Sequence, residues 1–130
     1  NNFGSGSTMS MSLTTPNTAV RCYLTWQYDV TLAAHFELYE GGTASGGTAF
    51  TPLNRNRPSA NASACTALRD PSRSGGTLIY SADWGAASQK GIVGGGGDEI
   101  ILKQNTTYFF IITSDKSSNL AFQRIDWYEI

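Results

Sequence analysis

The stretch VRCYLTWQY at residues 20–28 decides the fold class of this chain. Apolar side chains occupy every second position in it: Val20, Cys22, Leu24, Trp26 and Tyr28. A β-strand turns successive side chains to opposite faces, so this alternation predicts a strand with one buried face. Residues 32–38 repeat the pattern a few positions later. We therefore expect these two strands to pair with each other as a hairpin.

Further strands are predicted on both sides of this pair. Residues 9–13 alternate until Pro16, which cannot donate to a ladder, and indicate an edge strand or an extended arm within residues 1–15. Residues 106–113 are apolar on both faces, which is typical of a strand in the middle of a sandwich or of one that covers a subunit contact. Other strands are expected at 65–68, 78–80, 100–103 and 120–130, and a glycine loop at 94–97.

Composition supports an all-β fold. Gly, Ser, Thr and Asn make up 50 of the 130 residues, whereas only three Lys and four Glu are present to cover helix faces. At 40% hydrophobic and 12% aromatic, the chain is too apolar to stay disordered. The chain contains no repeat that would indicate a propeller or a solenoid. We predict one domain over residues 1–130, an antiparallel two-sheet β-sandwich of jelly-roll or Greek-key type.

Charge and hydropathy exclude two classes of partner. The formal net charge is −1, so there is no basic surplus to follow phosphates, and we expect no nucleic acid partner. The longest apolar run, at 108–112, is far shorter than the ~20 residues that cross a bilayer, and we expect no membrane partner. The chain begins at Asn1 rather than Met, which we interpret as processing or as part of a longer protein.

Catalytic patterns are absent from the sequence. His35 is the only histidine and falls within a predicted strand, a poor place for a mobile general base. Asp98 and Glu99 lack the spacing of a calcium loop, and Glu37 and Glu40 are expected on opposite faces of a strand. We predict a protein that is not an enzyme and needs no metal or cofactor.

Two features remain for binding or assembly. Cys22 and Cys65 are the only cysteines, and we expect buried free thiols rather than a disulfide, although the sequence does not give their separation. The run Asn54, Arg55, Asn56 and Arg57 alternates amides with guanidinium groups. Such a run either bridges a subunit boundary or braces its own loop, and the sequence leaves both open. The predicted interface residues are Asn54, Arg55, Asn56, Arg57, His35 and Tyr128.

Five sequence blocks occur in a fixed order: FELYEG at 36–41, GGTA at 46–49, NRNR at 54–57, ILKQNTTY at 101–108 and WYE at 127–129. In this order they resemble a family of small virion structural proteins of tailed bacteriophages, over most of the chain from Pro16 onward. The resemblance implies a location in the virion, after assembly in the bacterial host cytoplasm, and a role in capsid decoration, a head fibre or the tail. No enzyme activity and no catalytic residue come with it.

Three functions follow as hypotheses. The first is a non-enzymatic capsid decoration or cement protein, expected as a homotrimer, whose partners are itself and the major capsid protein or other virion proteins, and which stabilises the assembled shell by binding it. The second is a tail or head-fibre component that binds carbohydrate through exposed aromatic residues, with Tyr23, Trp84 and Tyr128 as candidates. The third is a polysaccharide-degrading enzyme, motivated only by unpaired carboxylates.

Overall fold

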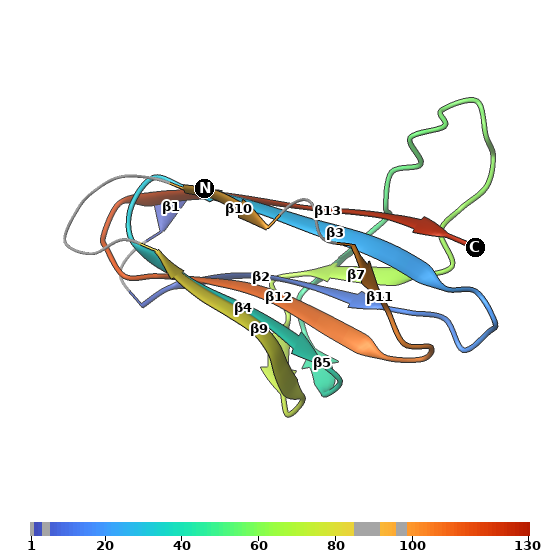
Figure 1. Ribbon diagram of the computed structural model, residues 1–130, viewed down its shortest axis with the longest axis horizontal. Helices are drawn as coiled ribbons and strands as arrows, with labels where there is room; N and C mark the ends of the chain where they lie inside the picture. Colours follow the sequence, from blue (N-terminus) through green and yellow to red (C-terminus); the bar gives the residue numbers. More distant parts are fainter. Residues whose placement is uncertain (1, 4–5, 85–91, 96–98) are drawn as a thin grey trace.

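The fold is known from a computed structural model, which describes residues 2–3, 6–84, 92–95 and 99–130, and of these describes only the backbone at 2–3, 84 and 92–95. The described part contains strands and no helix. Figure 1 shows two layers of strands that face each other, with the green segment at 51–65 projecting away from them. The all-β antiparallel sandwich predicted from the sequence is therefore confirmed.

Each layer is an antiparallel sheet. The five-stranded sheet runs β1 (Asn2–Phe3), β13 (Asn119–Glu129), β3 (Cys22–Val30) and β10 (Ile92–Gly95), with β11 (Ile100–Ile101) also paired to β3. The six-stranded sheet runs β6 (Thr48–Phe50), β7 (Thr66–Arg69), β2 (Thr8–Thr14), β12 (Thr107–Ser114), β4 (Ala34–Glu40) and β9 (Thr77–Trp84). A small third sheet pairs β5 (Thr43–Ser45) with β8 (Ser72–Ser74).

The core lies between the two large sheets and is rich in aromatic rings. The alternation of β3 appears directly in its burial, with Cys22, Leu24, Trp26, Tyr28 and Val30 all buried. Tyr28 stacks on Phe36 of the opposite sheet with ring centroids 3.9 Å apart, and Trp26 meets Phe110 edge-on at 5.4 Å. Aromatic pairs in these geometries add to the gain from burial, so they fasten one layer to the other.

The predicted hairpin between residues 20–28 and 32–38 is wrong. β3 and β4 lie in different sheets, and the chain crosses between them at residues 31–33. The buried side chain of Asn119 holds this crossing: its amide nitrogen donates to the carbonyl oxygens of Leu32 (3.3 Å) and Ala33 (3.0 Å), and its oxygen accepts from the Leu32 N–H (3.0 Å). An alternating pattern shows which face is buried, but not the layer to which a strand belongs.

The structure tests three further predictions, for residues 9–13, 94–97 and 106–113. The strand at 9–13 is not at an edge, because β2 lies between β7 and β12. Pro16, which suggested an edge, lies beyond the end of β2 at Thr14 and therefore takes no ladder position. The Ser10 hydroxyl on the polar face donates to the carbonyl of buried Pro71 at 3.1 Å. The prediction of a glycine loop at 94–97 is wrong for Gly94 and Gly95, because both belong to β10. Residues 96–97 lie outside the described part. The two-faced strand at 106–113 does run through the middle of a sheet, as β12 between β2 and β4.

The last strand, predicted at 120–130, divides its side chains between two faces. Ile125 and Trp127 of β13 pack against the core, whereas Phe122, Tyr128 and Ile130 point outward and are exposed. No helix in the described part of the chain is long and apolar enough to cross a bilayer.

Candidate functional site

The segment at 51–65 forms one wall of a groove beside β13. This segment connects β6 to β7 and leaves the sandwich, as the green trace in Figure 1 shows. Between it and strands β3 and β13 lies an open groove of about 1210 Å³. Both faces of β13 contribute to its lining, Tyr128 from the outer face and Trp127 from the face that packs against the core. The groove opens to solvent, so it is available to a ligand or to another chain.

Two stacked tyrosines form part of the lining of this groove. Tyr23 of β3 and Tyr128 of β13 are opposite each other in the ladder, and their rings stack with centroids 4.9 Å apart and an interplanar angle of 4°. The Tyr128 hydroxyl donates to the Glu99 carboxylate at 3.1 Å, which fixes the ring. The sequence predicted Tyr128 as an interface residue, and the alternation of both strands already placed the two rings on the outer face.

A cluster of charges crosses the groove. The Asp126 carboxylate accepts from the Arg124 guanidinium at 2.6 Å and lies 3.8 Å from the Arg55 guanidinium of the projecting segment. Arg55 is largely exposed, so its pairing with Asp126 adds little stability. With two guanidinium groups around one carboxylate, this part of the groove keeps donors available for a partner.

The run Asn54, Arg55, Asn56 and Arg57 braces its own loop, one of the two roles left open by the sequence. The Asn54 side-chain oxygen accepts from the Asn56 N–H at 2.9 Å, and its amide nitrogen donates to the Asn61 carbonyl at 3.1 Å. Arg57 donates to the Asn54 carbonyl at 3.3 Å. Within this run, only Arg55 contacts another element, through Asp126 of β13. The hydrogen bonds within the loop hold its shape, and the guanidinium groups of Arg55 and Arg57 are exposed.

Glu129 holds the base of the projecting segment, a role that the sequence did not reveal. Its carboxylate accepts from the Ser63 hydroxyl, from the Ala64 N–H at 3.0 Å and from the Trp127 indole N–H at 2.9 Å. Burial by itself raises the pKa of Glu129, but these hydrogen bonds outweigh it and hold the pKa below its ordinary value. Ser63 and Ala64 are more than sixty positions away in the chain, so no local pattern marks these two partners.

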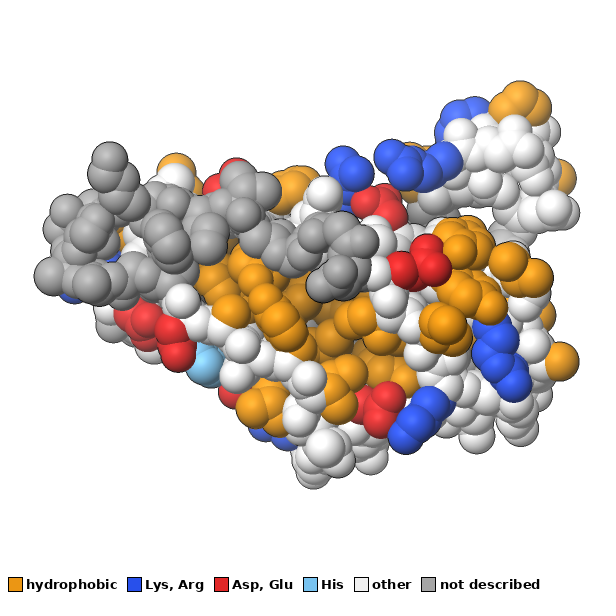
Figure 2. Space-filling model, in the orientation of Figure 1, with side chains coloured by type: hydrophobic (Ala, Val, Ile, Leu, Met, Phe, Trp, Pro, Cys, Tyr) orange, Lys and Arg blue, Asp and Glu red, His pale blue; other side chains and the backbone are white. Residues whose placement is uncertain are grey.

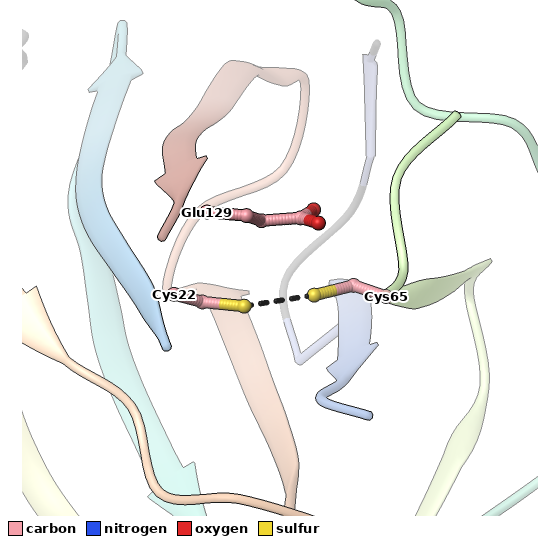
Figure 3. A group of neighbouring side chains, drawn as sticks. All are labelled: Cys22, Cys65 and Glu129. Atoms are coloured by element: carbon pink, nitrogen blue, oxygen red, sulfur yellow. Dashed lines mark hydrogen bonds between the residues drawn. The ribbon is translucent and has the colours of Figure 1, made fainter. Parts of the chain in front are cut away.

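The two cysteines meet next to Glu129 (Figure 3). Both are free and buried, as the sequence predicted, and their Sγ atoms lie 3.0 Å apart. Ligand atoms of Cys22, Cys65 and Glu129 all lie within 4.8 Å of one another. The inward position of Cys22 follows from the alternation of β3, but nothing in the sequence around Cys65 predicts that it faces Cys22.

His35 lies apart from the groove, on the outer face of the six-stranded sheet. Its imidazole bonds to the Asp83 carboxylate of β9, and its other ring nitrogen lies 3.3 Å from the Glu37 carboxylate. Burial opposes protonation, but the two carboxylates outweigh it and raise the pKa of His35. The predicted interface residues therefore divide: Tyr128 and Arg55 share the groove, whereas His35 belongs to another surface.

Most of the exposed large apolar side chains of the described residues lie on or next to two strands, the others being Leu53 of the projecting segment and Ile101 of β11. On β9 they are Leu78, Ile79 and Tyr80, and on β13 and the residue after it they are Leu120, Phe122, Tyr128 and Ile130. β9 is the last strand of its sheet among the described residues and pairs only with β4. Figure 2 shows that, on the face it draws, hydrophobic side chains also gather in the hollowed middle of the molecule.

The described carboxylates of the groove are all engaged by neighbours. Asp126 binds arginines, Glu129 binds Ser63, Ala64 and Trp127, and Glu99 accepts from Tyr128. The arrangement therefore suits hydrogen bonding and ring stacking. Of the other candidates, Asp98 and the Trp84 side chain lie outside the described part, and Glu37 and Glu40 point to opposite faces of β4 toward Tyr39 and Tyr108.

Comparisons with protein-family models, with curated proteins and with solved structures find no significant match to this chain. The resemblance to virion structural proteins therefore rests on the five sequence blocks alone, and what it implies enters below as a proposal.

Proposed function

We propose that this protein is a non-enzymatic structural protein of a tailed phage particle, which assembles as a homotrimer and stabilises the shell that it covers. The observation that carries this proposal is the concentration of exposed apolar side chains on the edge strand β9 and on the outer face of β13. Exposed apolar side chains in such numbers favour a site of protein contact.

The edge strand gives the strongest support. Natural proteins protect an open strand edge with charges, proline, a short length or a β-bulge. β9 is eight residues long, contains no proline, and exposes Leu78, Ile79 and Tyr80 in succession. Its ladder with β4 is irregular only opposite Leu38 and Tyr39. Of its eight residues only Asp83 is charged, and that carboxylate binds His35. A neighbouring chain that covers β9 satisfies its backbone groups and buries these side chains.

The assembly can be tested on the purified chain. We expect gel filtration with light scattering to give about three times the chain mass of 14.0 kDa. The substitution Ile79→Lys places a charge on the edge strand and is expected to release monomers, whereas Ala60→Lys, exposed in the projecting segment and outside both strands, is expected to leave the trimer intact. A mass of one chain for the wild type would contradict the proposal.

The virion role needs a separate measurement. We expect mass spectrometry of purified particles to find the protein in stoichiometric amounts, and particles that lack it to lose their DNA at lower temperature, because a protein that binds only the assembled shell stabilises that shell. Its absence from purified particles would refute the virion role even if the chain is a trimer.

A second function, carbohydrate binding, is favoured by the groove. The stacked pair Tyr23 and Tyr128 offers an aromatic surface, and the guanidinium groups of Arg55 and Arg124 provide hydrogen-bond donors beside it. Binding on a glycan array that is lost in Tyr128→Ala, but kept in Phe122→Ala, would establish it. Phe122 is a matched control because it is exposed on the same face of β13 and does not line the groove.

A further inference from the structure

Cys22 and Cys65 come from opposite layers of the sandwich and meet inside it. Cys22 is the first residue of β3, in the five-stranded sheet, and Cys65 directly precedes β7, in the six-stranded sheet. Figure 3 shows the two side chains pointing at each other, with their Sγ atoms 3.0 Å apart. A disulfide bond is about 2.05 Å long, so the sulfur atoms are about 1 Å from bonding distance.

We propose that Cys22 and Cys65 form a structural disulfide when the chain folds in the presence of a small-molecule disulfide oxidant such as oxidised glutathione. The thiolate of one cysteine attacks a sulfur of the oxidant and releases one glutathione thiolate. The thiolate of the other cysteine then attacks the mixed disulfide and releases the second glutathione thiolate. The protein loses two electrons and two protons, and the oxidant becomes two glutathione thiols that carry both.

Hydrogen bonds fix the backbone at each cysteine. The Cys22 carbonyl accepts from the Leu102 N–H at 2.9 Å, and Cys22 pairs with Glu129 in the ladder between β3 and β13. The Cys65 N–H donates to the Ser63 hydroxyl at 3.0 Å. Because the sulfur atoms already lie 3.0 Å apart, the remaining gap is small compared with the reach of two side chains.

The bond would fasten the projecting segment at its base. The cysteines are 43 positions apart, and the closed loop contains all of the segment at 51–65. That segment contains no strand. The Glu129 carboxylate accepts hydrogen bonds from Ser63 and Ala64, which directly precede Cys65. A crosslink at the same point restricts the unfolded chain and keeps the groove wall on the sandwich.

The surroundings favour a bond that is formed once and kept. Burial raises the pKa of both thiols, and the nearby Glu129 carboxylate raises them further. Thiolate is therefore scarce in the folded protein, and exchange with an oxidant takes place while the chain is still open. After folding, the same burial keeps reductants away from the bond.

A metal ion bound by Cys22, Cys65 and Glu129 is the alternative to a disulfide, and the hydrogen bonds of Glu129 disfavour it. A structural zinc site has four ligands, and the described residues provide three within reach, namely Cys22, Cys65 and Glu129. The Glu129 oxygens already accept from Ser63, Ala64 and Trp127. Binding a metal would break these bonds at the base of the segment, whereas a disulfide leaves them intact.

The test refolds the full chain with oxidised and reduced glutathione and analyses it after denaturation and alkylation. We expect an intact mass lower than that of the reduced chain by two hydrogen atoms, with no alkylated cysteine. We expect reduction to lower Tm by roughly 10 °C. The double variant C22S/C65S is the matched control, and its Tm is expected to be the same with and without reductant. The mass measurement needs only the wild type, so it stands even if the variant does not fold.

Three results would overturn the assignment. The first is two alkylated cysteines in folded protein that has been refolded with oxidised glutathione. The second is zinc at one ion per chain in elemental analysis of protein whose thiols are free. The third is native protein that loses its disulfide to dithiothreitol as fast as protein in guanidinium chloride does, because a buried bond must be protected by the fold.

Discussion

Glu129 is the residue on which the base of the projecting segment most depends. Replacing it with alanine leaves the Ser63 hydroxyl, the Ala64 N–H and the Trp127 indole without their shared acceptor. We expect Glu129→Ala to lower the free energy of unfolding by about 2 kcal/mol, measured by urea denaturation. Glu99→Ala is the control, since Glu99 is exposed, and we expect it to change stability by less than about 0.5 kcal/mol.

The contribution of Glu129 to the free energy of unfolding also depends on pH, and it decreases on acidification. Its pKa in the folded protein is below the ordinary value of 4.5, because the hydrogen bonds outweigh the effect of burial. The stability from its charge is therefore fully present above 4.5 and is lost as the pH falls through the folded pKa. The difference in unfolding free energy between wild type and Glu129→Ala should shrink on acidification. A difference that is constant from neutral to acidic pH would contradict this role.

His35 offers the cleanest titration in the molecule, because it is the only histidine. Burial disfavours its charged form, but Asp83 and Glu37 outweigh burial and raise its pKa above 6.5. Its stabilising contribution is therefore present below pH 6.5 and is lost as the pH rises through the folded pKa. We expect NMR titration to give a pKa above 6.5 in the wild type and a lower one in Asp83→Asn. A wild-type pKa at or below 6.5 would show that the carboxylates do not act on it.

At the scale of elements, the sequence predicts the longer strands, misses short ones such as β5, β6 and β8, and does not give their layers. The buried positions of β3 follow from the period of two, because burial of one face is a local property of the chain. The assignment of β3 and β4 to opposite sheets depends on Asn119, more than eighty residues away, which holds the crossing at 31–33. Likewise, the groove needs the contact between the segment at 51–65 and β13, which no local pattern encodes.

The turn between β5 and β6 supplies a test at this scale. Gly46 and Gly47 both have positive φ, at 66° and 77°. A Cβ atom at Gly47 would lie 2.7 Å from the Arg69 carbonyl oxygen and 3.0 Å from Pro71, whereas one at Gly46 would meet nothing within 4 Å. We expect thermal unfolding to show a loss of about 1 kcal/mol for Gly46→Ala, from backbone strain alone. The loss for Gly47→Ala should be about 3 kcal/mol, because backbone must also move. Equal losses would mean that the close approach of the turn to β7 does not matter.

At the scale of the whole molecule, the sandwich combines a well-packed interior with unusually apolar strands at its surface. The interior aromatic contacts join the two large sheets, so the fold does not depend on a partner for its core. Other apolar side chains of β9 and β13, such as Ile79 and Phe122, are exposed instead. Tyr80 is partly exposed and also contacts Trp26 and Tyr28 of the core. That division is what we expect of a building unit which is complete as a domain and buries further surface when copies assemble.

The central claim is that these exposed strands are contact surfaces between copies of the chain. Light scattering coupled to gel filtration of the purified wild type tests it most directly. The account predicts a single species of about three times 14.0 kDa that Ile79→Lys converts to the mass of one chain. A wild type that remains at 14.0 kDa up to its solubility limit would contradict it.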